Sequence, residues 1–137
     1  MAQVLMLEGD TALSILLGHY LRSVGHSVTI ASNLLESRVW LDLAWFDVVV
    51  VDIGDDVREG LSFCQTVRAT SQNSRTRLLV VSGAPGMENI AASVGADAFL
   101  PKPLGLRQIR DCVSGLMGTP AALSSGPVVM PTILYAS

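Results

Sequence analysis

The sequence predicts an α/β fold, in which a five-stranded parallel sheet is covered by helices on both faces. Short β-branched or apolar runs alternate with amphipathic stretches five times along the chain, a pattern typical of βαβ units. Residues 48–51 are four consecutive valines, as expected for a central parallel strand that is buried on both faces. The length of 137 residues suits one compact domain with a sizeable core.

The expected elements follow one another in strict alternation. The first helix is predicted from the apolar positions Leu13, Leu16, Leu17, Tyr20 and Leu21, which recur at helical spacing, and Gly25 is a common residue just after a helix. Right-handed crossovers then place the helices in layers on both sides of the sheet. The predicted strands are 4–7, 27–31, 46–51, 78–81 and 98–100, and the predicted helices are 11–24, 34–43, 61–69, 88–94 and 105–117.

Composition narrows the classes of function. The net charge is −3 and no cluster of lysines and arginines occurs, so we expect no direct binding of nucleic acid. No apolar run is long enough to span a bilayer and no signal peptide is evident, so we expect a cytoplasmic protein. Cys64 and Cys112 lack metal-binding spacing and are expected to be buried free thiols. After residue 117 the chain becomes rich in Gly, Pro, Ser and Ala, which predicts a domain at 1–117 and a tail or linker at 118–137.

Polar residues gather where the predicted strands end. In open α/β sheets, ligands bind outside the carboxyl ends of the strands. Taken singly, each residue has a structural explanation, such as capping of a helix by Asp10, a turn at Ser82 or a solvated Lys102. Taken together they favour a site, and Asp52 is the strongest candidate because it follows a wholly apolar strand. The residues concerned are Glu8, Gly9 and Asp10 after the first strand, Asp52 and Gly54 after the third, Ser82 after the fourth and Lys102 after the fifth.

Five segments resemble the receiver domains of two-component response regulators in order and spacing. The resemblance covers about residues 4–117 and implies a flavodoxin-like, doubly wound five-stranded parallel sheet with helices on both faces. The segments are VLMLEGD at 4–10, FDVVVVDIG at 46–54, EGL at 59–61, LLVVSGA at 78–84 and GADAFLPKP at 95–103.

The resemblance also implies a role for each site residue. Asp52 would be the phosphoacceptor, taking a phosphoryl group from a histidine kinase or a phosphotransfer protein. Ser82 would bond a phosphoryl oxygen and act with Phe99 as a switch, and Lys102 would pair with the phosphate next to a cis peptide bond before Pro103. A downstream partner would bind the face formed by residues 88–94, 98–100 and 105–117. Apart from the resemblance, the last predicted helix and the apolar tail at 128–135 allow a homodimer.

The predicted metal site departs from the family pattern. By resemblance, Mg²⁺ would be held by Glu8, by Asp52 and by the backbone carbonyl of Gly54, with Asp10 helping through water. Gly9 stands where family members carry a second acidic residue, so we expect weak Mg²⁺ binding. Asp56 replaces a usual proline and adds negative charge. These departures leave a second hypothesis open, in which the chain is an atypical receiver that acts as a phosphorylation-independent interaction module.

Two enzymatic or cofactor-binding alternatives fit poorly. Haloacid-dehalogenase-type phosphatases need a second Asp two residues after the nucleophile, where this chain has Gly54. Cobalamin-binding modules need a DxHxxG loop, and neither His19 nor His26 lies in one. We therefore do not expect an enzyme.

Overall fold

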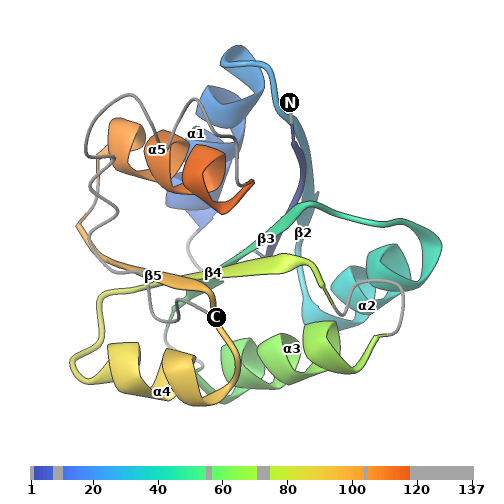
Figure 1. Cartoon of the computed structure of the whole chain (residues 1–137), viewed down its shortest axis with the longest axis vertical. Helices are drawn as coiled ribbons and strands as arrows, with labels where there is room; N and C mark the ends of the chain where they lie inside the picture. Colours follow the sequence, from blue (N-terminus) through green and yellow to red (C-terminus); the bar gives the residue numbers. More distant parts are fainter. Residues whose placement is uncertain (1, 8–10, 55–56, 71–74, 104, 118–137) are drawn as a thin grey trace.

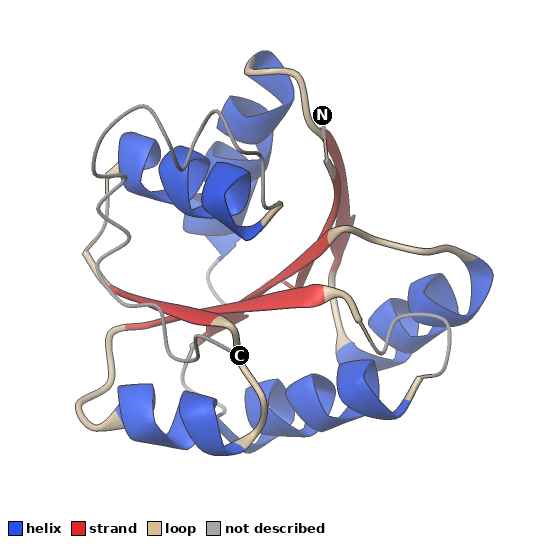
Figure 2. Ribbon diagram, viewed as in Figure 1, coloured by secondary structure: helices blue, strands red, loops and turns tan. Residues whose placement is uncertain are grey.

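The computed structural model describes residues 2–7, 11–54, 57–70, 75–103 and 105–117. Its five strands form one parallel sheet of order β2-β1-β3-β4-β5. Helices α1 and α5 cover one face and α2, α3 and α4 cover the other (Figure 1), so that the sheet is the middle of three layers (Figure 2). The predicted fold class is confirmed. The predictions made for Glu8, Gly9, Asp10, Asp56 and the tail at 118–137 lie outside the described residues.

The boundaries agree with the sequence prediction within one residue for all but two elements. The third strand continues through Asp52 and Ile53, which pair with Val81 and Ser82 of the next strand, so the prediction of 46–51 was wrong at both ends. The elements are β1 (Gln3–Leu7), α1 (Thr11–Ser23), β2 (Ser27–Ala31), α2 (Leu34–Leu43), β3 (Val48–Ile53), α3 (Val57–Ala69), β4 (Arg77–Ser82), α4 (Met87–Ser93), β5 (Ala98–Pro101) and α5 (Leu106–Leu116).

Helix α3 begins four residues earlier than predicted, at Val57 rather than 61. Glycine is a poor helix former, so Gly60 does not by itself favour a helix. In the structure Gly60 lies on the buried face of α3, and a Cβ atom added there would stand 2.6 Å from Cγ1 of Ile53. Packing against the end of β3 therefore outweighs the low helix propensity of glycine and brings α3 close to the strand that carries Asp52.

We expect the substitution Gly60→Ala to destabilise the fold by about 1–2 kcal/mol, because overpacking against the stiff Ile53 exceeds the gain in helix propensity. Urea unfolding measures this change. Gly83→Ala is the matched control, since its Cβ would meet Lys102 Cβ at an ordinary 3.5 Å. A Gly60→Ala variant as stable as the parent would contradict the close packing of α3 on β3.

Each face of the sheet has its own apolar core, and each core contains one cysteine. Cys64, on the buried side of α3, packs against one face of the sheet. Cys112, on the buried side of α5, packs against the opposite face. Both are free thiols, as predicted, and burial raises the pKa of each to about 12. Because the thiolate is the reactive form, both side chains are inert near neutral pH and serve as small apolar residues.

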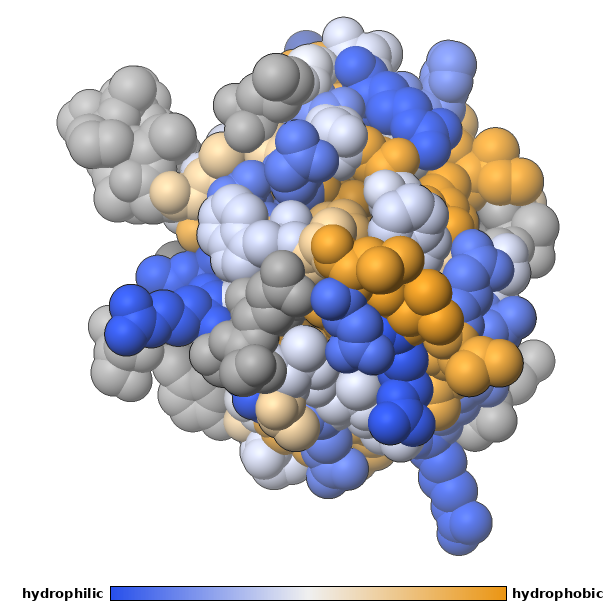
Figure 3. All heavy atoms as spheres, turned by 90° about the vertical axis from the view of Figure 1, so that its right-hand side faces the viewer, coloured by the Kyte–Doolittle hydropathy of each residue, from blue (hydrophilic) through white to orange (hydrophobic). Residues whose placement is uncertain are grey.

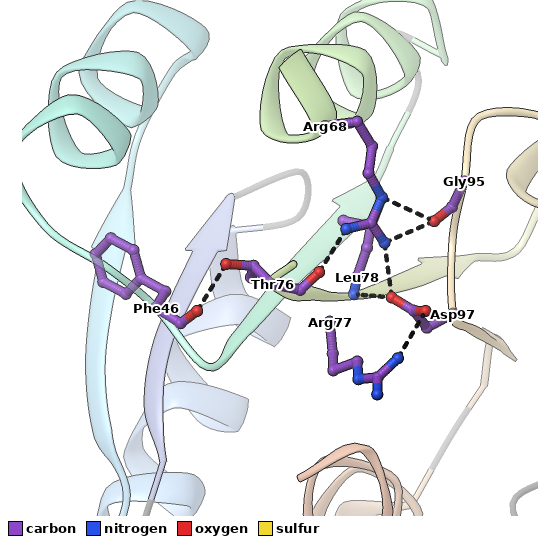
Figure 4. A network of polar contacts seen from close by, with 7 residues as sticks. All are labelled: Phe46, Arg68, Thr76, Arg77, Leu78, Gly95 and Asp97. Carbon is purple, nitrogen blue, oxygen red and sulfur yellow. Dashed lines mark hydrogen bonds and ion pairs between the residues drawn. The ribbon is translucent and has the colours of Figure 1, made fainter. Parts of the chain in front are cut away.

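A polar network lies at the amino-terminal ends of β4 and β5, on the side of the sheet where the strands begin (Figure 4). The Arg68 guanidinium, at the end of α3, donates to the carbonyl oxygens of Gly95 and Thr76 and pairs with Asp97 at 2.6 Å. The Asp97 carboxylate also accepts the backbone N–H of Leu78. The network therefore ties α3 to the first residues of β4 and to the segment leading into β5.

No described helix combines the length and the apolar composition that a membrane crossing requires.

Candidate functional site

Asp52 is a buried carboxylate at the end of β3. It is the fifth residue of a six-residue strand and is 3% exposed. Its Oδ1 atom lies 2.5 Å from Nζ of Lys102. A carboxylate removed from water is costly unless it meets an opposite charge, and the Lys102 ammonium supplies that charge. The ion pair is thus the central electrostatic feature of this edge of the sheet.

Lys102 reaches Asp52 across the end of an intervening strand, since β4 lies between β3 and β5. Its backbone N–H donates to the carbonyl oxygen of Ser82 at 3.0 Å, which fixes the lysine beside the last residue of β4. The bond between Lys102 and Pro103 is cis, as the family resemblance implied. Gly83 follows Ser82, and the Lys102 side chain passes close to it.

Ser82 lies at the same edge but on the other face of the sheet. It pairs with Ile53, whereas Asp52 pairs with Val81, and successive side chains of a strand point to opposite faces. The Ser82 hydroxyl accepts the N–H of Ala84 at 3.1 Å, which leaves its own hydrogen to be donated. The structure therefore brings Lys102 to Asp52 directly and places Ser82 on the adjacent strand, one register position further along.

Phe99 is in the middle of β5 and is 4% exposed. It pairs with Val80, two residues before Ser82, so its ring is on the same face of the sheet as the Ser82 hydroxyl. The two predicted switch residues thus share the core between the sheet and helices α3 and α4.

Ser14 contacts Asp52 and was missed by the sequence prediction. It is fully buried on α1, and its hydroxyl donates to Oδ2 of Asp52 at 3.4 Å. The predicted apolar face included Leu16, which is wrong, because Leu16 is 52% exposed. The buried face runs instead through Ser14, Leu17, Gly18 and Leu21. The spacing of these four residues, i, i+3, i+4 and i+7, is that of one helix face, and it was the signal in the sequence that Ser14 is buried.

The donor chemistry of the described site suits a hard cation only in part. Mg²⁺ prefers carboxylate and carbonyl oxygens, which Asp52 and Gly54 offer. Among the residues whose placement is described, no group of three or more Asp, Glu, His and Cys side chains could hold a metal ion. The predicted ligands Glu8 and Asp10 lie outside the described residues. A shallow groove of about 640 Å³ between α2 and α3 contains none of the predicted site residues.

Comparison with known proteins identifies the family. Residues 4–114 match the model of the response regulator receiver domain. The chain belongs to the response regulator receiver family. Among solved receiver structures, the chemotaxis response regulator CheY4 of Vibrio cholerae is 26% identical, with a TM-score of 0.76 over 85% of this chain and 98% of that one.

Two further matches come from proteins of different kinds. The virulence transcriptional regulatory protein PhoP of Salmonella typhimurium is 27% identical over 133 residues, which cover 96% of this chain but only 58% of PhoP. The receiver domain of the sensor histidine kinase PA1611 from Pseudomonas aeruginosa shares the fold at 18% identity, with a TM-score of 0.76 over 86% of this chain and 98% of that one. That structure holds a magnesium ion in its active site cleft.

Proposed function

We propose that Asp52 is the phosphoacceptor of this receiver domain and that Ser82 and Lys102 assist it. The observation that carries the proposal is the buried ion pair between Asp52 and Lys102 at the carboxyl ends of β3 and β5. This edge is where parallel α/β sheets bind ligands. An apolar residue could fill this buried position without a counter-charge, so the presence of a carboxylate here favours chemistry.

The proposed reaction is a phosphoryl transfer from a phosphohistidine of a histidine kinase or phosphotransfer protein. A carboxylate oxygen of Asp52 forms a bond to phosphorus while the bond between phosphorus and the histidine nitrogen breaks. The electron pair stays on the imidazole, which takes a proton from solvent. Lys102, already at Asp52, can turn its ammonium towards the new phosphoryl oxygens, where charge-assisted bonds are strongest.

The proposed output is a change in the surface formed by α4, β5 and α5. The Ser82 hydroxyl would donate to a phosphoryl oxygen, moving from its present bond with Ala84. Phe99 lies on the same face of the sheet and can fill space that the serine vacates. A downstream protein that prefers one arrangement would then shift the equilibrium between two states.

Magnesium is proposed as a weakly held cofactor. Asp52, the backbone carbonyl of Gly54 and Glu8 would hold it, with Asp10 acting through water. When bound, the ion neutralises charge on the phosphoryl oxygens. Lys102 supplies part of the same charge neutralisation from the chain itself. This supports phosphorylation even though Gly9 replaces one of the acidic residues that bind the metal in family members.

We propose a cytoplasmic location and a domain at 1–117 with a tail or linker at 118–137. The chain spans 58% of the length of PhoP, whose name describes a transcriptional regulator. We propose a role in transcription only for a longer protein that contains a receiver domain of this kind. In such a protein, the present chain would be the part that responds to phosphorylation.

The test is to treat the chain with acetyl phosphate and Mg²⁺ and to record the intact mass. We expect the added mass of one phosphoryl group, and borohydride trapping should place it on the peptide that contains Asp52. Asp52→Asn should give no adduct, whereas Asp111→Asn, at a half-buried position of α5 where the carboxylate pairs with Arg110, should react as the parent does. The absence of an adduct, or an adduct that survives Asp52→Asn, would contradict the proposal and favour the phosphorylation-independent module.

We expect Ser14→Ala to slow this phosphorylation about fivefold, because the lost hydrogen bond to Oδ2 of Asp52 contributes about 1 kcal/mol to orienting the carboxylate. The rate of adduct formation measures the effect. Ser23→Ala is the control on the same helix, since Ser23 is exposed and bonds only the carbonyl of Tyr20. Equal rates for Ser14→Ala and the parent would show that Ser14 does not orient Asp52.

A further inference from the structure

Helix α2 is apolar on two opposite faces. Its inner face buries Ser37 and Leu41 completely. On the opposite face, Leu35, Val39 and Leu43 are 75%, 50% and 71% exposed. These three residues are spaced at i, i+4 and i+8, so they form a continuous line along the helix, here called the outer stripe.

The described part of the chain leaves the outer stripe uncovered. Helix α2 packs against α3, β2 and β1, which lie between it and the rest of the molecule (Figure 1). Leu35, at the start of the stripe, also lines the shallow groove shared with α3. Figure 3 faces the side of the molecule where α2 lies and shows apolar side chains gathered on it. Trp40 and Trp45 add partly exposed rings at the same end of the molecule, 37% and 52% exposed. A contiguous exposed apolar patch usually marks an interaction site.

Charges beside the outer stripe indicate what covers it. Arg38 and Asp42 are both exposed, one helical turn apart on the same flank of the stripe, and neither forms an ion pair with another described residue. In an antiparallel pair of identical helices related by a two-fold axis, the same flanks face each other. Arg38 of each copy then meets Asp42 of the other, while Leu35 meets Leu43 and Val39 lies near the axis. The surface is therefore complementary to itself, as an isologous interface requires.

We propose that the chain forms a homodimer through the outer stripes of two antiparallel α2 helices, flanked by two symmetric ion pairs between Arg38 and Asp42. A ten-residue helix is about 15 Å long, so the contact is smaller than the roughly 800 Å² per partner of a standard interface. The dimer is accordingly weak and reversible, with dissociation in the micromolar range. Asp52 and Lys102 are not among the residues of this interface.

Sedimentation velocity of the full chain over micromolar to submillimolar concentrations tests the dimer. We expect a concentration-dependent shift from monomer to dimer and at least a tenfold weaker association for Val39→Lys. Ile15→Lys, at a 58% exposed apolar position on α1, is the matched control and should associate as the parent does. A parent chain that stays monomeric, because its own tail or a different protein covers the stripe, would overturn the proposal, as would a dimer indifferent to Val39→Lys.

Charge reversal tests the antiparallel arrangement. A dimer of the Arg38→Asp variant would have four acidic groups beside the stripes, and a dimer of the Asp42→Arg variant would have four basic groups there. Because like charges repel, each variant by itself should be monomeric. An equimolar mixture should form a heterodimer, because every flanking contact then joins opposite charges, although both chains lack the Arg38–Asp42 combination within the helix. Circular dichroism checks that each variant is folded. Single variants that dimerise normally, or a mixture that remains monomeric, would exclude this interface.

Discussion

Replacement of Lys102 with methionine is expected to destabilise the fold by about 3 kcal/mol near neutral pH, because it leaves a buried carboxylate without its counter-charge. Asp52 is 1% exposed at its side chain, whereas Lys102 is 20% exposed. Water can therefore reach the ammonium but hardly the carboxylate. Methionine matches the length and flexibility of the lysine stem, so the loss measures the charge rather than the packing.

This difference in exposure predicts an asymmetric double-mutant cycle. Asp52→Asn should cost much less than Lys102→Met, because a freed lysine can extend its charged end to solvent. The double variant Asp52→Asn with Lys102→Met should recover most of the stability lost in Lys102→Met alone. Urea unfolding of the four proteins gives the coupling directly. Equal losses for the two single variants, or no recovery in the double variant, would show that the ion pair does not dominate this site.

The same substitution has a chemical readout. Lys102→Met should also reduce phosphorylation by acetyl phosphate strongly, since no other described cation lies at the carboxylate. Lys102→Arg keeps the charge but spreads it over a planar group of different reach, so we expect it to restore stability more than phosphorylation. A variant that is stable and yet phosphorylated poorly separates the role of Lys102 in folding from its role in the reaction.

Much of this site could be predicted from topology before any coordinates were known. Parallel strands end at a common edge, so an acidic residue after one strand and a lysine after another are brought together whatever the length of chain between them. The pairing of Asp52 with Lys102 follows from that rule, together with the strand order that the receiver resemblance implied. The neighbouring position of Ser82 follows in the same way, because it ends the strand between them.

Three features were not predicted, each for a physical reason. Ser14 escaped notice because a leucine-rich helix offers several apolar faces, and the chosen face included the exposed Leu16. The start of α3 was placed too late because the close approach of Gly60 to Ile53 is a tertiary contact that helix propensity does not contain. The outer stripe of α2 was not predicted, since spacing alone does not tell which of two apolar faces is buried.

The two edges of the sheet contribute differently to the molecule. The edge where the strands end carries Asp52 and Lys102, and its polar residues are available for chemistry. The edge where the strands begin carries Arg68 and Asp97, whose bonds are directed to backbone groups. These bonds fix β4 and β5 against α3 at one end of the strands, and the register set there determines where Ser82 and Lys102 stand at the other end.

Arg68→Met is therefore expected to destabilise the protein by about 3 kcal/mol. The Arg68 side chain is 26% exposed. Its guanidinium donates to the carbonyl oxygens of Gly95 and Thr76 as well as to Asp97 (Figure 4). Each partly buried acceptor left without its donor costs roughly 1 kcal/mol or more. Burial of Thr76, which donates its hydroxyl to the carbonyl of Phe46, limits the access of replacement water.

Arg77→Met provides a matched control within the same network. Arg77 is 55% exposed and reaches Asp97 only at 3.5 Å, so its removal should cost less than about 0.5 kcal/mol, as for other solvent-exposed ion pairs. Urea unfolding of both variants measures the difference. If folded Arg68→Met is phosphorylated on Asp52 at the parental rate, the network stabilises the scaffold without tuning the chemistry. Similar losses for Arg68→Met and Arg77→Met would mean that charge near Asp97, rather than the bonds of Arg68 to the backbone, holds this edge of the sheet together.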